Sequence, residues 1–335
     1  MSVRDNRKFN NIRHSNCAKR RKKREMSRML LLAMAAVVLL LALVLATFGV
    51  CALVQGIKNR QGQENPNIGD PSSVRFKEAT LANTQANVGE LVLVNKDHSY
   101  PDNLSGLSSL VENRAQADSN NVYGLVYQAD TESFTPRLQK AALDAFNAMM
   151  LEHYRIFSDS SVIISSAYRA YSHQVKINST IEAGHSDHHT GYTVALRQYV
   201  PQEDKIVDLP LSHWIYSNCH KYGFIMRYPG DKFAETGVSD YNNCFRYVGI
   251  PHAYYISNAG ICLEEYVTLL RGYNSAKPLS ISMPDGKNYL VYYTALGENG
   301  ITSIKLPENY SYTISGDNVG GFIITVDLSS PIPTA

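Results

Sequence analysis

Residues 186–196 read SDHHTGYTVAL, and this stretch decides the fold. Two adjacent histidines, His188 and His189, stand in a loop directly before a short apolar run at 193–196 that predicts a strand. Imidazole is the commonest side-chain ligand for protein-bound metals. The stretch therefore places two histidines directly before a buried strand.

A second stretch, residues 236–249, reads TGVSDYNNCFRYVG and contains two more candidate positions, Tyr241 and Cys244. Three further segments accompany these two: LVLVNK at 91–96, SAYR at 166–169 followed by Gln174, and YGFIMRYP at 222–229 followed by Lys232. Together the segments stand in order over about residues 90–272, a little over half of the chain.

In this order the segments resemble the zinc D-alanyl-D-alanine carboxypeptidases of the vancomycin-resistance type, which trim peptidoglycan stem peptides. That family writes the first stretch as S-E-H-x-T-G-x-A-V-D-L and the second as T-G-x-x-Y-E-P-W-H-F-R-Y-V-G. The resemblance implies the hedgehog/D-Ala-D-Ala peptidase fold. The mixture of helical patterns and turn-linked strand patterns also favours an α+β domain.

In the family's pattern three side chains bind zinc and a glutamate is the general base. His188 stands at the first ligand position, but Ala195 replaces the aspartate ligand and Cys244 replaces the last histidine. Tyr241 stands where the glutamate belongs. A catalytic zinc site needs three protein ligands, an open position for water, and a base that accepts the proton of that water. We therefore expect no catalytic residue and no cofactor, with weak zinc binding by His188 and Cys244 at most.

The same resemblance implies a peptide-binding cleft. Arg169 matches the arginine that contacts the terminal carboxylate of the substrate, and Gln174 and Ser186 stand in matching positions beside it. Two interpretations of Arg169 stay open: it binds a peptide carboxylate, or it holds an ion pair within the cleft.

The other histidines and cysteines give weaker evidence for a metal site or a disulfide. Five other histidines have no spacing that builds an independent metal site (His185, His189, His213, His220 and His252). Three of the five cysteines follow the N-terminal region, which leaves at least one unpaired. A Cys219–Cys262 disulfide is possible, and the sequence does not decide it.

The N-terminal region differs in charge from the rest. Residues 1–28 carry eleven Lys and Arg against two acidic side chains, a net charge of +9, and because the chain sums to +2 the remainder sums to −7. Residues 29–54 contain no charged side chain and are long enough to span a bilayer. A cleaved signal peptide is the alternative, but the apolar run is too long for one. The positive-inside rule then predicts a single-pass plasma-membrane protein with a cytoplasmic N-terminus and an extracytoplasmic C-terminal domain. Beside such a span, the basic cluster is explained as a topology signal. We therefore expect no nucleic-acid partner.

Five segments are therefore expected: a basic tail (1–28), a transmembrane helix (29–54), a polar linker (55–88), the carboxypeptidase-like domain (89–277) and a small β-rich appendage (278–335). Within the domain we expect strands at 91–95, 123–127, 161–165, 193–196 and 245–248. We expect helices from Thr135-Pro136 onward, and at 172–180, 211–222 and 262–271.

The sequence thus favours a catalytically inactive pseudopeptidase at the peptidoglycan that binds stem peptides or a cell-wall partner. One alternative is an active D,D-carboxypeptidase with an atypical zinc site. Another is an ectodomain that serves only as an interaction surface. Metal analysis together with an assay for D-alanine release separates the first two.

Overall fold

The computed structural model describes residues 71–101, 107–109, 128–129, 136–177, 180–239 and 241–333. The main sheet has the strand order β3 (Gln128–Ala129), β5 (Val162–Ser166), β6 (Thr193–Val200), β9 (Cys244–Tyr247) and β8 (Phe224–Met226), and β7 (Lys205–Asp208) pairs with β6. Only the β3–β5 pair is parallel. The strand 123–127 expected from the sequence lies outside the described residues.

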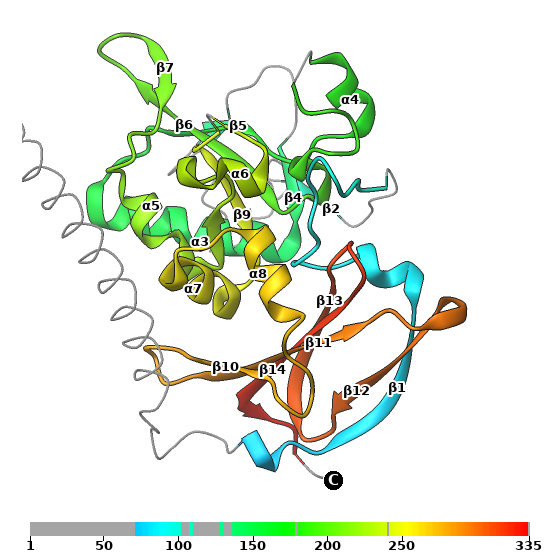
Figure 1. The fold of residues 1–335 in the computed structure, drawn as a ribbon. Coiled ribbons are helices and arrows are strands. Elements are labelled where there is room, and N and C mark those ends of the chain that lie inside the picture. Colours follow the sequence, from blue (N-terminus) through cyan, green and yellow to red (C-terminus); the bar gives the residue numbers. More distant parts are fainter. Residues whose placement is uncertain are drawn as a thin grey trace, which may run out of the picture. The chain divides into compact units, whose positions relative to one another are not determined.

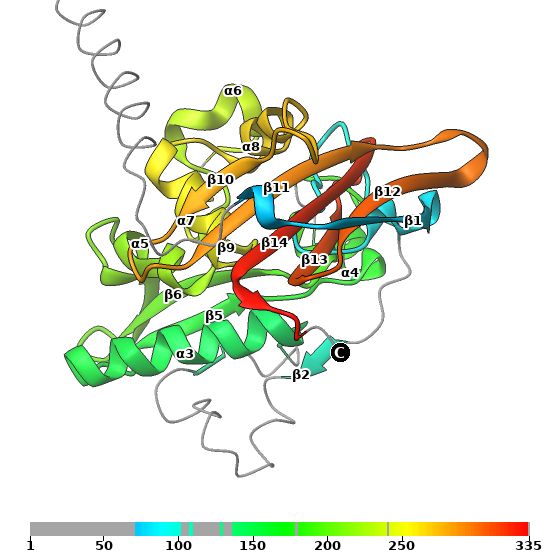
Figure 2. The same ribbon diagram turned by 90° about the horizontal axis from the view of Figure 1, so that it is seen from below.

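The long helix α3 (Lys140–Phe157) covers one face of this sheet (Figure 2). Its apolar face, including Phe146 and Met150, packs against β5, β6, β8 and β9 in one fully buried core. The helix begins later than Thr135-Pro136 predicts, because Arg137–Gln139 is extended as β4 and pairs with β2 (Leu107–Ser109). The expected apolar helix is therefore confirmed, and its predicted start is wrong.

The shorter helices connect these strands. They are α4 (Tyr171–Lys176), α5 (Trp214–Asn218), α6 (Phe233–Thr236), α7 (Ile250–Ala259) and α8 (Leu263–Leu270), with 3-10 turns at η3 (Asp187–Thr190), η4 (Cys219–Tyr222) and η5 (Gly230–Lys232). Gly223 ends η4 with a φ of 83°, a left-handed conformation that favours glycine. The helices predicted at 172–180, 211–222 and 262–271 are confirmed in position, and α7 and β8 were not foreseen.

The segment 91–95 is not the expected strand. Its backbone carbonyls instead accept hydrogen bonds from two buried arginines, since Arg246 Nη2 donates to Glu90 O and Val92 O, and Arg227 Nη2 donates to Val94 O. Guanidinium groups thus satisfy the polar backbone that a neighbouring strand would otherwise satisfy.

The C-terminal region is β-rich, as predicted. A four-stranded antiparallel sheet has the order β10 (Leu279–Ser282), β11 (Asn288–Ala295), β14 (Gly321–Pro331) and β13 (Tyr310–Gly316). Leu279, Val291 and Ile323 of this sheet share a core with the apolar faces of α7 and α8. The region therefore packs directly on the carboxypeptidase-like part.

The predicted linker 55–88 needs correction over its second half. Residues 71–87 contain η1 (Pro71–Ser73), β1 (Phe76–Ala82) and η2 (Asn83–Asn87), and β1 pairs antiparallel with β12 (Ile301–Pro307), which follows η6 (Glu298–Gly300), over seven residues (Figures 1 and 2). The polar composition of this stretch conceals a strand because β1 is an edge strand, most of whose side chains are exposed or half-buried. The domain boundaries as a whole stay a prediction.

The predicted single-pass plasma-membrane localisation is corrected here. Within the described residues, no helix is both long enough and apolar enough to cross a membrane. The segment 29–54, like the basic tail 1–28, lies outside the described residues.

The described cysteines are not bridged. Cys219, Cys244 and Cys262 are all buried free thiols. Cys219 packs in the core between α3 and the main sheet, whereas Cys262 caps α8. The Cys219–Cys262 disulfide, which the sequence left open, is therefore not formed in the structure.

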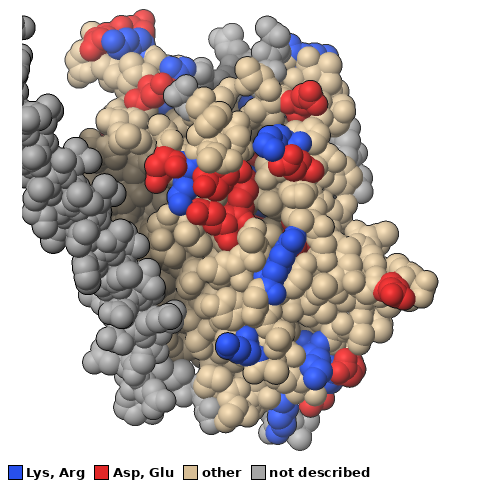
Figure 3. Space-filling view, viewed as in Figure 1, with Lys and Arg blue, Asp and Glu red and all other residues tan. Residues whose placement is uncertain are grey.

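Charged side chains are unevenly spread over the face seen in Figure 3. On that face the described acidic side chains gather near α6 and α8, which carry Glu235, Glu264 and Glu265, whereas the described lysines and arginines are scattered.

Candidate functional site

A cavity of about 670 Å³ opens where β5, β6 and β9 meet. Its lining residues come from β5 and the turn after it, η3, β6, the end of β7, α5, and the segment before β9: Ser165, Ser166, Arg169, His188, Ala195, Arg197, Asp208, Leu209, Leu211, Tyr216, Tyr241, Asn242, Asn243 and Cys244. The cavity thus brings together every position at which the sequence departs from the family's zinc site.

Strand pairing brings two of these positions together. Ala195 on β6 is the partner of Cys244 on β9, and Ser166 on β5 is the partner of Ala195 on its other side. Cys244 Sγ lies 3.9 Å from His188 Nε2. Ala195, Cys244 and Tyr228 form a small buried apolar cluster. The place expected to hold a metal is therefore occupied by a methyl group, a thiol and an aromatic ring.

His188 is oriented like a metal ligand. Its Nδ1 lies 2.8 Å from the carbonyl oxygen of Ala167, so that Nδ1 carries the proton and Nε2 faces Cys244. Burial, followed by the positive charge of Arg169, lowers the pKa of His188 to about 3. At neutral pH the ring is therefore neutral.

Cys244 is a poor partner for His188. Burial and then the negative charge of Asp187 raise the pKa of the Cys244 thiol to about 12. The group is protonated at neutral pH, whereas zinc and electrophiles both react with the thiolate. Burial in an apolar cluster thus accounts for an inert thiol.

No third ligand completes the pair within the described part of the chain. His189 uses both ring nitrogens, since Nδ1 lies 2.6 Å from Arg169 O and Nε2 accepts from Gly184 N at 3.0 Å. His185 Nδ1 lies 2.7 Å from Asn95 O and faces a second pocket. Among the described His, Cys, Asp and Glu side chains, none joins His188 and Cys244 in a group of three. The residues present therefore do not fit a catalytic zinc ion.

Arg169 lines the cavity and has no carboxylate partner among the described residues. Its Nη1 donates to Gln174 Oε1 and its Nη2 donates to Ser166 Oγ, both at 2.8 Å. Gln174 is itself fixed because its Nε2 donates to Ile181 O. Burial lowers the pKa of Arg169 below its ordinary value, yet a guanidinium stays charged at neutral pH. Two neutral groups thus hold an uncompensated positive charge at the cavity wall.

Two predicted residues do not line the cavity. Gln174 acts on it only through Arg169, and Ser186 is buried beneath η3, where its carbonyl accepts the N–H of His189. Tyr241 does line the cavity and is 39% exposed. The wall formed by Arg197, Asp208 and the segment 209–216 was not foreseen, because it depends on the pairing of β7 with β6 and on the path of the chain after β7.

Directly behind His188 lies a buried ionic network. Asp187 Oδ1 accepts from Arg246 Nη1 at 2.7 Å and from Arg227 Nε at 3.1 Å, and its Oδ2 accepts from Thr193 Oγ1. Glu264 binds the other side of Arg227 at 2.7 Å. Burial alone would raise the pKa of Asp187, but the two arginines and Thr193 outweigh burial and lower that pKa to about 2. The network fixes the base of η3, and with it His188.

Comparison with known proteins identifies the fold and the family. A family model described as "VanY: D-alanyl-D-alanine carboxypeptidase" matches residues 127–250. A D-alanyl-D-alanine carboxypeptidase of Enterococcus faecium is 30% identical over 263 residues, which cover 76% of this chain and 80% of that protein. The chain belongs to the VanY family of D-alanyl-D-alanine carboxypeptidases.

Solved structures of vancomycin-resistance peptidases agree with this assignment. The D,D-dipeptidase VanXYg, solved in complex with a D-Ala-D-Ala phosphinate analog, is 25% identical and matches with a TM-score of 0.62 over 76% of this chain and 99% of its own. A mutant of the VanB-type D,D-pentapeptidase VanY, solved in complex with Zn(II), matches at 24% identity with a TM-score of 0.40 over 53% of this chain and 98% of its own. The match to VanXYg confirms the mixed helix-and-sheet peptidase fold that the sequence predicted.

Proposed function

We propose that this VanY-family chain binds the C-terminal carboxylate of peptidoglycan stem peptides without cleaving them. The observation that carries the proposal is the contrast within one cavity. Arg169 presents a positive charge with no carboxylate partner among the described residues, while His188, Ala195, Tyr241 and Cys244 supply neither three metal ligands nor a carboxylate base.

Arg169 suits a terminal carboxylate. A guanidinium carries five N–H donors, and only two of those on Arg169 are used by Gln174 and Ser166. The remaining donors can bind both oxygens of a carboxylate, which is the strong bidentate arrangement. Because Gln174 and Ser166 fix the guanidinium plane in advance, little side-chain entropy is lost when a peptide binds.

The same cavity does not suit hydrolysis. With its pKa near 3, His188 is a weak base at neutral pH, and with its pKa near 12 the Cys244 thiol is a weak nucleophile. Tyr241 presents a phenol where hydrolysis needs a carboxylate. The groups that bind the peptide end are therefore present, and those that would activate water are not.

Calorimetry with a synthetic pentapeptide ending in D-Ala-D-Ala tests the proposal. Arg169→Ala is expected to weaken binding by about 10- to 100-fold, the loss expected for hydrogen bonds to a charged group. Arg155→Ala removes an exposed arginine on α3 and serves as the matched control that keeps wild-type affinity. An amidated pentapeptide, which lacks the carboxylate, should bind as weakly to the wild-type protein as the free acid binds to Arg169→Ala.

Two results would reject the proposal. Equal affinity of wild type and Arg169→Ala would show that the cavity no longer recognises a peptide carboxylate, and would favour an interaction surface elsewhere on the chain. Zinc-dependent release of D-alanine from the pentapeptide would show an active D,D-carboxypeptidase with an unusual site.

A further inference from the structure

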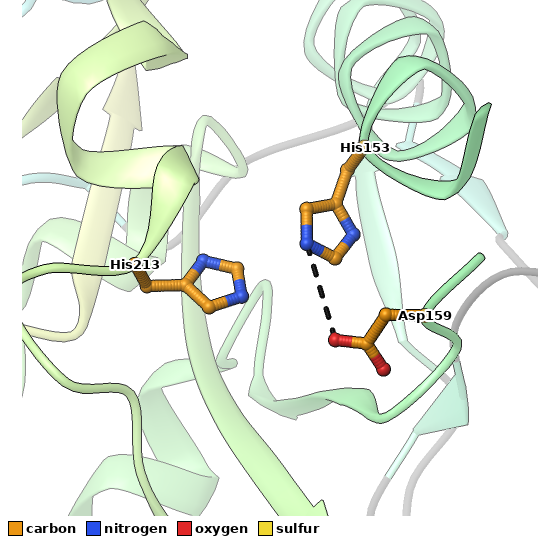
Figure 4. A group of neighbouring side chains, drawn as sticks. All are labelled: His153, Asp159 and His213. Atoms are coloured by element: carbon orange, nitrogen blue, oxygen red, sulfur yellow. Dashed lines mark ion pairs between the residues drawn. The ribbon is translucent and has the colours of Figure 1, made fainter. Parts of the chain in front are cut away.

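Three potential metal ligands meet at the far end of α3, away from the residues that line the cavity. His153 lies in the last turns of α3, Asp159 follows in the loop to β5, and His213 is the N-cap of α5. One donor atom from each side chain lies within 4.8 Å of the others, and His153 Nε2 is 4.0 Å from Asp159 Oδ2. Figure 4 shows both rings and the carboxylate directed toward a common space. Sequence spacing did not predict this group, because His213 is sixty positions from His153.

The cluster is incomplete in its hydrogen bonds. His153 is only 2% exposed, yet its Nδ1 has no hydrogen-bond partner among the described residues, and its Nε2 faces Asp159 from beyond hydrogen-bond range. Buried ring nitrogens are normally satisfied, so an unsatisfied one needs an explanation. A cation bound between Asp159 Oδ2 and His153 Nε2 would give Nε2 a partner, whereas Nδ1, on the other side of the ring (Figure 4), takes no part in the cluster.

The chemistry of the three donors points to one class of ion. Two imidazole nitrogens and one carboxylate oxygen form a common ligand set for zinc, with a fourth position left for water. We propose that His153, Asp159 and His213 bind a divalent transition-metal ion of the zinc type. Burial lowers the pKa of both histidines, that of His213 to about 4, so both rings are neutral at neutral pH and each carries one lone pair.

Metal binding requires two modest adjustments. Ligand atoms about 2.0–2.1 Å from a tetrahedral zinc lie about 3.3 Å apart, so the present spacing must shorten by roughly 1 Å through side-chain rotation. His213 Nδ1 accepts the N–H of Ile215 at 3.3 Å. If His213 binds the ion through Nε2, its ring proton lies on Nδ1. Nδ1 can then no longer accept the N–H of Ile215, and this long capping hydrogen bond is lost.

This site would be distinct from the one that the family motifs describe. His188 and Cys244 take no part in it, and the proposal does not rest on peptide binding. The site would nevertheless affect the cavity, because Leu211 and Tyr216, on either side of His213 in the sequence, line the cavity wall. A bound ion would therefore link the part of the cavity wall around His213 to α3.

The chain contains an intrinsic fluorescent probe for this ion. Trp214 is the single tryptophan, and its ring lies 5.9 Å from that of His153. Titration of the full-length, untagged protein with Co²⁺ should quench the tryptophan fluorescence saturably at one ion per chain, and Zn²⁺ should restore the fluorescence by competition. Asp159→Asn and His213→Gln, at half-buried positions, should each weaken Co²⁺ binding by at least about 10-fold, since even outer-shell changes at metal sites cost that much.

Two control variants distinguish this site from other metal-binding groups. Cys244→Ser removes the thiol of the cavity, and His173→Gln removes an exposed histidine on α4. Both should keep the wild-type Co²⁺ affinity. Absence of saturable quenching in the wild type would overturn the proposal. So would quenching that persists in Asp159→Asn and His213→Gln, or quenching that disappears in Cys244→Ser.

Discussion

Asp187 and His188 are neighbours in the sequence, yet their surroundings differ in how completely polar groups are satisfied. Asp187 lies among Arg227, Arg246 and Thr193, and every one of these side chains hydrogen-bonds to it. His188 faces a cavity in which an alanine and a protonated cysteine stand at the expected ligand positions. The side of η3 that supports the fold is intact, whereas the side that would perform the reaction is not.

On the proposed function, the fold of this chain has outlasted its chemistry. Removing Asp187 would leave the buried guanidinium of Arg246 without its carboxylate, which is among the most costly changes in a protein, whereas Arg227 would keep Glu264. At two of the ligand positions, Ala195 and Cys244 instead form a small buried apolar cluster with Tyr228, which leaves no charge unpaired. Stability therefore constrains the first set of residues more strongly than the second.

Asp187→Asn should have the largest effect. Arg246 would lose its carboxylate partner while still fully buried, so we expect the free energy of unfolding to fall by about 3–5 kcal/mol. Urea denaturation followed by circular dichroism measures the change. A loss below about 1 kcal/mol would show that the ionic network does not support η3.

The next largest effect concerns the pH dependence of stability, to which His188 and Asp187 should contribute over different pH ranges. His188 has an ordinary pKa of 6.5, lowered to about 3 in the folded protein, so the unfolded chain binds the extra proton between these values. Stability is then fully present above pH 6.5 and is lost as the pH falls toward 3, by up to about 1.4 kcal/mol per pH unit. His188→Gln should flatten the slope by that amount, and the exposed control His173→Gln should leave it unchanged.

Asp187 should add a second loss at lower pH. Its pKa falls from 3.8 to about 2 on folding, so its contribution is present above pH 3.8 and disappears as the pH falls toward 2. Identical slopes for wild type and His188→Gln between pH 6 and 4 would contradict the neutral, buried state of His188.

Asp208→Asn should have the smallest effect. Asp208 pairs with Arg197 at 3.2 Å at the rim of the cavity, but its side chain is 80% exposed. Exposed ion pairs contribute about 0–1 kcal/mol, so the same urea experiment should show a change within that range. A loss comparable to that of Asp187→Asn would mean that the rim, and not the buried network, holds the β6–β7 hairpin in place.

The sequence predicted the site better than it predicted the boundaries of elements. Motif positions alone placed His188, Ala195, Tyr241, Cys244 and Arg169 together, and the structure brings all five to one cavity. Gln174 was assigned to the substrate, but it acts by holding Arg169. Ser186 was assigned likewise, and it is buried away from the cavity.

Other failures have tertiary causes. The short β-branched run at 91–95 predicted a strand, but the arginine side chains of β9 and of the residue after β8 take the place of a partner strand. The polar composition before residue 88 concealed β1, whose pairing depends on β12, more than two hundred residues away. The His153–Asp159–His213 cluster was missed for the same reason, since only the fold brings α3 and α5 together.

One measurement tests most directly the central claim that the fold is present without its reaction. D-alanine release from a D-Ala-D-Ala pentapeptide should be compared between the wild type and the triple variant Ala195→Asp, Tyr241→Glu, Cys244→His, both with added Zn²⁺. We predict no release above background by the wild type and measurable release by the triple variant, because the variant adds two ligands to His188, which makes three, and restores the base. Zinc-dependent release by the wild type, or none by a correctly folded triple variant, would contradict the account.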